Sequence, residues 1–205
     1  MIVTALEPDP RRPGSVRVLV DGRAFATVDT AAASGLEPGG PLADATAERL
    51  ARAADAEAAY RTVLRALERR PHARADLARR LLRRGLAAEA VENALARAER
   101  AGLLDDAAFA RHYVATRTER GRGPARLARD LLALGVARPL VDAAITEQWP
   151  AEADRRALPA ALAAKRAAQL GNLPRPAKRR RLLAFLARRG FTGSEALEAV
   201  AGALR

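Results

Sequence analysis

Arginine is the most abundant side chain in this sequence that could bind a ligand or partner through its charge. The 205 residues include 36 Lys and Arg against 24 Asp and Glu, which gives a net charge of +12. A guanidinium group donates two parallel hydrogen bonds to a phosphate or a carboxylate, so an arginine excess favours binding to an anionic partner. The excess is regional: the net charge is −2 over residues 1–56, +5 over 57–104, +1 over 105–150 and +8 over 151–205.

Side chains suited to catalysis or metal binding are scarce. The absence of cysteine excludes disulfides, thiolate nucleophiles and thiolate metal sites. Two histidines, His72 and His112, and three serines leave few groups for a zinc site or a serine–histidine triad. Asp105 and Asp106 are adjacent carboxylates, but neighbouring helical side chains diverge by about 100°, which suits neither a shared metal nor an acid–base pair. We therefore predict that the protein is not an enzyme and has no catalytic residue, metal or cofactor.

The basic residues gather on three segments with the pattern of amphipathic helices. In the first two segments, leucines occupy one side of the helical circumference and arginines the other. In the third, basic residues crowd the first turns and the helix end. Acidic groups do not balance these faces in the sequence, although Asp76 and Asp130 lie nearby. Thirteen basic residues are the predicted contacts with a partner or nucleic acid: Arg79, Arg80, Arg83, Arg84, Arg122, Arg126, Arg129, Lys178, Arg179, Arg180, Arg181, Arg188 and Arg189.

The elements that position these residues are predicted to be helices. Alanine is the commonest residue and aromatic residues make up only 3% of the chain. Alanine has the highest helix propensity, whereas sheets favour aromatic and β-branched residues. The composition therefore indicates a mainly α fold.

A pattern of apolar residues before a glycine occurs three times. It ends at Gly85, Gly135 and Gly190, with leucine eight, four and three positions earlier, except that Ala187 replaces the last leucine of the third copy. Residues at these offsets lie on one face of a helix. A glycine after the last apolar position predicts that the helix ends there in the left-handed conformation. An apolar residue follows each glycine, as expected for such a helix end.

Each copy of this pattern lies between two further predicted helices. The preceding helices are predicted over residues 57–69, 105–119 and 151–170, with Pro159 interrupting the last. The following helix carries an i, i+4 apolar pair in every copy. We therefore predict three tandem three-helix repeats, over 57–104, 105–150 and 151–205, which form an elongated, curved array.

Residues 1–56 differ from the repeats in charge and in pattern. The sequence Asp21-Gly22 separates two short apolar runs, which predicts a β-hairpin because a tight turn needs positive φ. A helix is predicted over 45–56, with Asp44 as its cap. A small hairpin is marginally stable alone, so we expect this N-terminal extension to pack on a helix or a partner. The runs of β character are Ile2–Ala5, Val16–Val20 and Ala24–Val28.

The middle of the chain resembles the RecX family, which are bacterial regulators of the RecA recombinase. The resemblance lies in GLLDDAAFARHYV, which begins at Gly102, and in RTERGRGPARLARDLLALGV, which begins at Arg117. The segment ALERRPHARADLARRLLRRGL is similar to the first repeat of the family, so the resemblance covers residues 57–148. Residues 151–205 fit the third repeat more loosely, because Pro159 and Ala187 depart from the pattern.

This resemblance implies both an architecture and a function. In the family, tandem three-helix units form a curved molecule that lies in the groove of the RecA filament on DNA. The resemblance therefore implies that this chain binds the RecA recombinase filament and the phosphate backbone of DNA. It would inhibit ATP hydrolysis, strand exchange and filament growth, and so modulate recombination and the SOS response. With no apolar run of membrane-spanning length and no signal-peptide pattern, we expect a cytoplasmic monomer without membrane association.

The alternative is a direct DNA-binding protein that uses a three-helix module as a helix-turn-helix, as a transcription regulator does. A sequence-specific reader is expected to concentrate Asn, Gln or Arg on one recognition helix. Here the basic residues spread over three modules, and Asn93 and Asn172 are the only asparagines. Contacts to phosphate would be independent of sequence.

Overall fold

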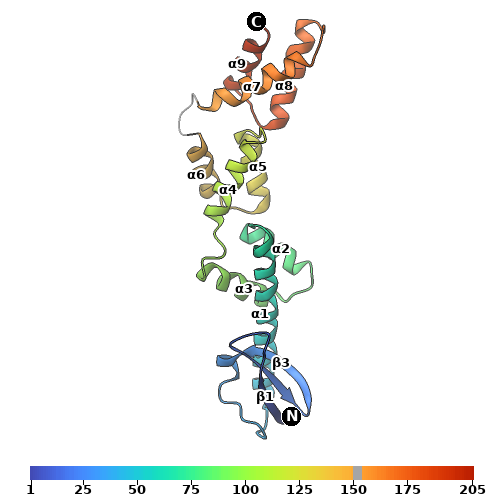
Figure 1. The fold of residues 1–205 in the computed structure, drawn as a ribbon, viewed down its shortest axis with the longest axis vertical. Coiled ribbons are helices and arrows are strands. Elements are labelled where there is room, and N and C mark those ends of the chain that lie inside the picture. The colour runs from blue at the N-terminus through green and yellow to red at the C-terminus, as the bar shows by residue number, and fades with distance from the viewer. Residues whose placement is uncertain (150–153) are drawn as a thin grey trace. The chain divides into compact units, whose positions relative to one another are not determined.

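The computed structural model describes residues 1–149 and 154–205 (Figure 1). The chain divides into two compact units, Met1–Leu104 and Asp105–Arg205. Helices dominate both units, and the first unit also contains a small sheet, which confirms the predicted fold class. Among the described residues, no helix combines the length and the apolar character that crossing a membrane requires.

The N-terminal sheet has three antiparallel strands in the order β1-β2-β3, and these correspond to the three predicted runs of β character. Asp21 and Gly22 form the predicted turn between β2 and β3, with φ of 49° and 78°. The first strand, β1, pairs with β2 from Val3 opposite Val20 onward. The strands are β1 (Val3–Pro8), β2 (Ser15–Val20) and β3 (Arg23–Asp29), followed by the short 3-10 helix η1 (Thr30–Ala33).

A single helix, α1 (Asp44–Arg69), replaces the two helices predicted over 45–56 and 57–69. The segment contains neither glycine nor proline, so nothing in it interrupts the helix. Its first half packs on the sheet, where Leu50 joins Val18 and Val28 in one core. Its second half contributes Val63 to the core of the first repeat. The boundary between 56 and 57 therefore falls inside a continuous helix.

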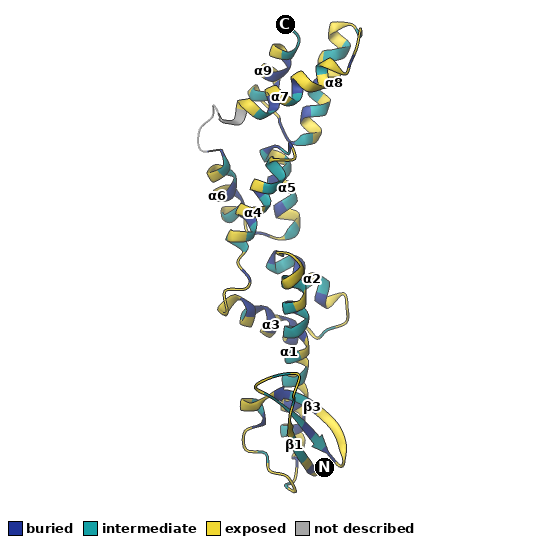
Figure 2. Cartoon of the chain, viewed as in Figure 1, coloured by how far each residue is buried: buried dark blue, intermediate teal, exposed yellow. Residues whose placement is uncertain are grey.

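Three three-helix modules follow one another, as the repeat predicts. Each module buries the apolar face of its middle helix, whose leucines eight and four positions before the glycine are at most 2% exposed (Figure 2). The third helices contribute Val91, Val141 and Val200 to these cores. The helices are α2 (Arg74–Leu82) and α3 (Ala88–Arg100) after α1, then α4 (Asp106–Thr118), α5 (Pro124–Leu134) and α6 (Arg138–Gln148), then α7 (Asp154–Ala168), α8 (Arg175–Arg189) and α9 (Ser194–Ala203).

The helix ends confirm the prediction from the three glycines. Gly85, Gly135 and Gly190 have φ of 82°, 88° and 94°. In each module, the residue that follows the glycine donates its amide hydrogen to the carbonyl of the leucine four residues before that glycine. In the second module, this is the hydrogen bond from Val136 to Leu131 at 3.1 Å. This 6→1 hydrogen bond is the Schellman arrangement, which ends a helix and satisfies a free carbonyl.

Two details of the predicted helices are wrong. Helix α7 runs through Pro159 instead of being interrupted by it. The leucines three positions before the glycine do not join the core: Leu82 is 45% exposed and Leu132 is 38% exposed. The buried face is therefore narrower than the three-residue pattern implies.

We expect Gly135→Val to destabilise the second module by at least about 1–2 kcal/mol, because an L-residue pays that amount in the left-handed region and a β-branched residue pays more. Thermal unfolding followed by the fluorescence of Trp149, the single tryptophan, measures the change, since this side chain is only 4% exposed. Ala137→Val is the control, because Ala137 is extended, with φ −62° and ψ 138°. Equal melting temperatures for the two variants would contradict the role of the left-handed glycine.

Candidate partner-binding surface

In the first module, the basic face is built around one buried carboxylate. Asp76, in the first turn of α2, accepts a hydrogen bond from Arg80 Nε at 2.8 Å and lies 3.9 Å from Arg79 Nη2. Asp76 is only 8% exposed. Arg83 and Arg84 follow the end of α2 and are exposed, and neither makes an ion pair within the described residues. The positive charges of Arg83 and Arg84 are therefore not neutralised by a carboxylate within the described residues.

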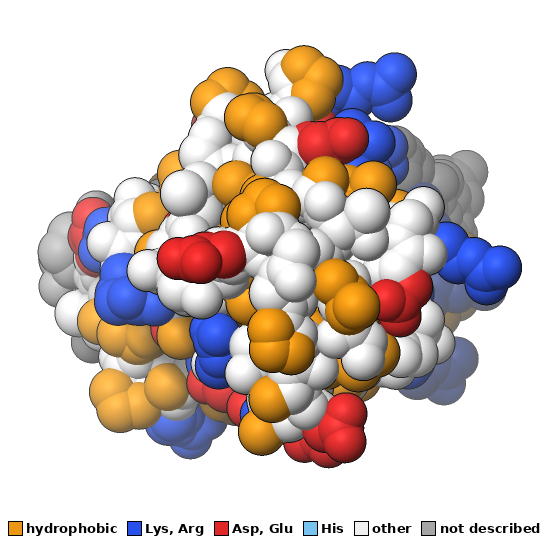
Figure 3. All heavy atoms as spheres, turned by 90° about the horizontal axis from the view of Figure 1, so that it is seen from below, with side chains coloured by type: hydrophobic (Ala, Val, Ile, Leu, Met, Phe, Trp, Pro, Cys, Tyr) orange, Lys and Arg blue, Asp and Glu red, His pale blue; other side chains and the backbone are white. Residues whose placement is uncertain are grey.

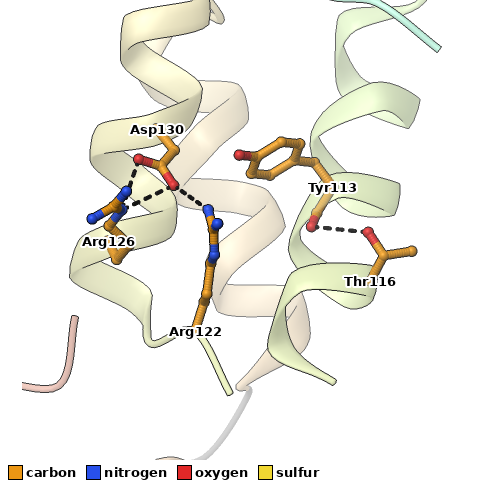
Figure 4. A network of polar contacts seen from close by, with 5 residues as sticks. All are labelled: Tyr113, Thr116, Arg122, Arg126 and Asp130. Carbon is orange, nitrogen blue, oxygen red and sulfur yellow. Dashed lines mark hydrogen bonds and ion pairs between the residues drawn. The ribbon is translucent and has the colours of Figure 1, made fainter. Parts of the chain in front are cut away.

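The second module repeats the arrangement with Asp130 on α5. Arg122 Nη1 donates to this carboxylate at 2.8 Å and Arg126 Nε donates at 3.0 Å (Figure 4). The Tyr113 ring projects from α4 toward the same cluster. Arg129 is exposed and has no carboxylate partner among the described residues. Internal ion pairing thus uses two of the three predicted basic residues of this module.

The third module contains the largest excess of positive charge. Helix α8 has no acidic residue, and Arg179, Arg180 and Arg181 are exposed on its first half. Arg189 differs from these, because its Nη1 donates to the carbonyls of Arg120 and Gly121 at 3.3 Å each. Its guanidinium also stacks 4.7 Å from the centroid of the Phe185 ring. Arg189 therefore makes contacts inside the molecule.

The structure corrects the expectation that acidic groups do not balance these faces. Asp76 and Asp130 neutralise part of the charge in the first two modules, while α8 stays unbalanced. We use the name unpaired basic residues for the predicted contacts that have no ion pair or internal carbonyl contact within the described residues: Arg83, Arg84, Arg129, Lys178, Arg179, Arg180, Arg181 and Arg188.

An exposed leucine accompanies a basic residue at the same place in two modules. Leu82 lies three residues after Arg79 on α2, and Leu132 lies three residues after Arg129 on α5. Residues three apart are neighbours on a helix surface, so each pair offers an apolar group beside a guanidinium. Sequence reasoning placed both leucines in the core, and only the observed burial identifies them as surface residues.

The second and third modules meet end to end through glycines. The Gly123 amide donates to the carbonyl of Arg189 at 2.7 Å, and the Ala125 amide donates to the carbonyl of Gly190 at 3.2 Å. The first free amides of α5 thus satisfy the last free carbonyls of α8. A Cβ on Gly123 would lie 2.7 Å from the carbonyl carbon of Gly190, so the two backbones approach closely. This junction holds the two basic helices in a defined relation.

The remaining candidate groups have structural roles or are exposed. Asp105 is the N-cap of α4 and accepts from the amides of Ala107 and Ala108 at 2.8 and 3.0 Å. These hydrogen bonds, with the charge of Arg111, lower the pKa of the Asp105 carboxyl. His112 is exposed on the same helix. Within the described residues, no three His, Asp or Glu side chains gather in a way that could hold a metal ion.

The observed modules match known protein families. Models of the first, second and third three-helix domains of RecX match residues 59–97, 105–145 and 160–200. The chain is 39% identical over 153 residues to the regulatory protein RecX of Halorhodospira halophila, which covers 73% of this chain and 91% of that protein. It is 38% identical over 171 residues to the regulatory protein RecX of Streptomyces coelicolor, covering 82% and 89%. A crystal structure of a regulatory protein RecX superposes with a TM-score of 0.80 over 98% of both chains at 24% identity, a similarity of fold.

Proposed function

The chain belongs to the RecX family of regulatory proteins, and on that premise we propose that it binds the RecA filament on DNA and inhibits it. Bound there, it lowers ATP hydrolysis, strand exchange and filament growth, and so modulates recombination and the SOS response. The protein itself catalyses no reaction. It acts as a monomer in the cytoplasm, where the unpaired basic residues contact phosphate and acidic side chains of the filament.

The observation that carries this proposal is the recurrence of unpaired basic residues on the middle helix of a module or directly after its end. A filament repeats its anionic groups along its length, so repeated basic helices can contact several of them at once. Each contact alone is weak because exposed charges are screened by salt, but linked contacts act together. The N-terminal extension has no such basic helix, and its net charge over residues 1–56 is −2. Figure 3 shows a face of the molecule on which basic, acidic and hydrophobic side chains are interspersed.

The exposed leucines of the first two modules favour a partner that includes protein. Leu82 and Leu132 are exposed, and phosphates alone would leave both in water. An apolar side chain covered by a partner contributes about 25 cal/mol for each Å² removed from water. A DNA backbone offers little apolar surface for this purpose, whereas a protein–DNA filament offers both apolar groups and phosphates. The pairing of leucine with arginine therefore supports a filament over naked DNA.

The direct test adds the protein to RecA assembled on single-stranded DNA with ATP. We expect the rate of phosphate release and the yield of strand exchange to fall as the protein is added, while the protein alone releases no phosphate. A pull-down should recover more protein with the assembled filament than with free RecA or with DNA alone. Unchanged ATP hydrolysis at a molar excess of the protein over RecA would contradict the proposal. Recovery by DNA alone to the same extent would favour the transcription-regulator alternative.

A further inference from the structure

A basic cavity lies within the first unit, at one end of the first module. It has a volume of about 480 Å³ and lies between the last turns of α1 and helix α2. Its lining contains no carboxylate. The lining residues are Thr62, Arg65, Ala66, Arg69, Arg70, His72, Leu77, Arg80, Leu81, Arg84 and Leu86.

The charge around this cavity is strongly positive and largely uncompensated. Arg80 is paired with Asp76. The other four guanidiniums, which belong to Arg65, Arg69, Arg70 and Arg84, are exposed and make no ion pair within the described residues. The ends of α1 and α2 contribute about half a negative charge each, far less than these cations supply. An anion in the cavity would relieve the mutual repulsion of the guanidiniums.

A buried histidine without a hydrogen-bond partner lines the same cavity. His72 is only 7% exposed, and its Nδ1 has no hydrogen-bond partner. The nearest carboxylate oxygen, Oδ2 of Asp76, lies 3.6 Å away, which is too far for a hydrogen bond. A buried polar atom without a partner costs free energy. Nδ1 has less than 1 Å² of accessible surface, so the phosphate contacts must come from the guanidiniums around it. Burial, together with the charges of Arg70 and Arg80, lowers the pKa of His72.

We propose that this cavity binds a phosphate ester of nucleotide size, with its phosphates held by Arg65, Arg69, Arg70 and Arg84. The volume lies within the range of about 300–1,000 Å³ typical of small-molecule sites. Guanidiniums supply the forked donors that phosphate oxygens accept. Ala66 and Leu86, which are partly exposed, provide apolar contacts for the rest of the ligand. The phosphate ester is either a free nucleotide or a nucleotide unit of a nucleic-acid strand.

This inference is independent of RecA, because it concerns a ligand of the chain alone. Three of its four arginines, Arg65, Arg69 and Arg70, lie on or directly after α1 and are not among the unpaired basic residues that contact the filament. A failure of filament inhibition therefore leaves the cavity intact as a site, and the reverse also holds.

The test is calorimetric titration of the full-length protein with ATP and, separately, with adenosine. We expect ATP to bind at least ten times more tightly than adenosine, because the phosphates supply the contacts. The variant Arg69→Gln/Arg70→Gln should weaken ATP binding at least tenfold. The control variant Arg11→Gln/Arg23→Gln removes the same charge from exposed positions of the N-terminal module and should bind ATP as the wild type does. Circular dichroism checks that both variants keep their helices.

Competition identifies the source of the phosphate ester. An oligothymidylate that displaces ATP from the wild-type protein assigns the cavity to a nucleic-acid strand, whereas failure to displace ATP assigns it to a free nucleotide. Two results would overturn the site: no heat of binding with ATP or the oligothymidylate, or equal ATP affinity in the cavity variant and the control variant.

Discussion

A protein carrying Arg83→Glu, Arg129→Glu, Arg180→Glu and Arg181→Glu is expected to inhibit the RecA filament on the order of 100-fold less effectively than the wild type. Each exposed ion pair contributes about 0.2–1 kcal/mol, and a reversed charge adds a repulsion of similar size. Four reversals together therefore reach about 3 kcal/mol, which corresponds to this factor. The four positions are exposed and have no internal carboxylate partner within the described residues. Changes at such positions alter stability by about 0.5 kcal/mol or less, so the fold should persist.

The control for this variant makes the same change in charge elsewhere. Arg11→Glu, Arg23→Glu, Arg100→Glu and Arg205→Glu also replace exposed arginines, none of which has an ion pair among the described residues. Titration of each variant into a RecA ATPase assay gives the concentration for half inhibition. If phosphates are contacted, the wild-type affinity should fall with salt at a log–log slope of about 0.7–0.9 per phosphate. Equal inhibition by the two variants would refute the role of the basic helices.

The second large effect is expected from Gly190→Ala, at the junction of the second and third modules. The new Cβ would lie 2.4 Å from both the backbone nitrogen and the Cβ of Arg126, and these atoms cannot move without shifting α5. The φ of +94° adds strain for any residue with a side chain. We expect a loss of about 2–5 kcal/mol in the free energy of unfolding, which combines the left-handed penalty with overpacking. Urea unfolding followed by circular dichroism measures it.

Gly171→Ala separates the two causes. Gly171 also has positive φ, at +55°, but a Cβ there meets nothing within 4 Å. Its substitution should therefore cost only the conformational penalty of about 1–2 kcal/mol. A similar loss of stability in both variants would mean that the close approach of Gly190 to Arg126 contributes nothing.

The regular parts of this fold could be predicted because local rules determine them. The turn at Asp21-Gly22 and the helix end at Gly135 each depend on backbone conformations that glycine adopts easily, and the sequence displays them directly. The leucine spacing likewise predicted the buried faces, including Leu77 and Leu127. Predicting these features does not require knowing which segments pack against them.

The site was harder to predict because its properties depend on tertiary contacts. Arg122 and Arg126 look free in the sequence, yet both bind Asp130. Arg189 was grouped with the partner-binding residues, but its guanidinium contacts carbonyls about 70 positions earlier in the chain. Leu82 is exposed because the neighbouring helices leave its side of α2 uncovered. A helical projection of α2 alone does not show which side its neighbours cover. The same limit concealed the cavity beside His72, which forms only when α1 and α2 come together.

The unbroken helix α1 also determines how the N-terminal sheet could be removed from this protein. A deletion that ends at residue 56 would leave a helix beginning in its middle turns, without its original first turn. A deletion that ends before Asp44 would keep the helix whole but uncover Ala47 and Leu50, which the sheet now shields. Substituting these two residues with polar ones would then restore a soluble helix face. The sheet is therefore not an independent domain that can be deleted alone, and its loss in evolution would require compensating changes on α1.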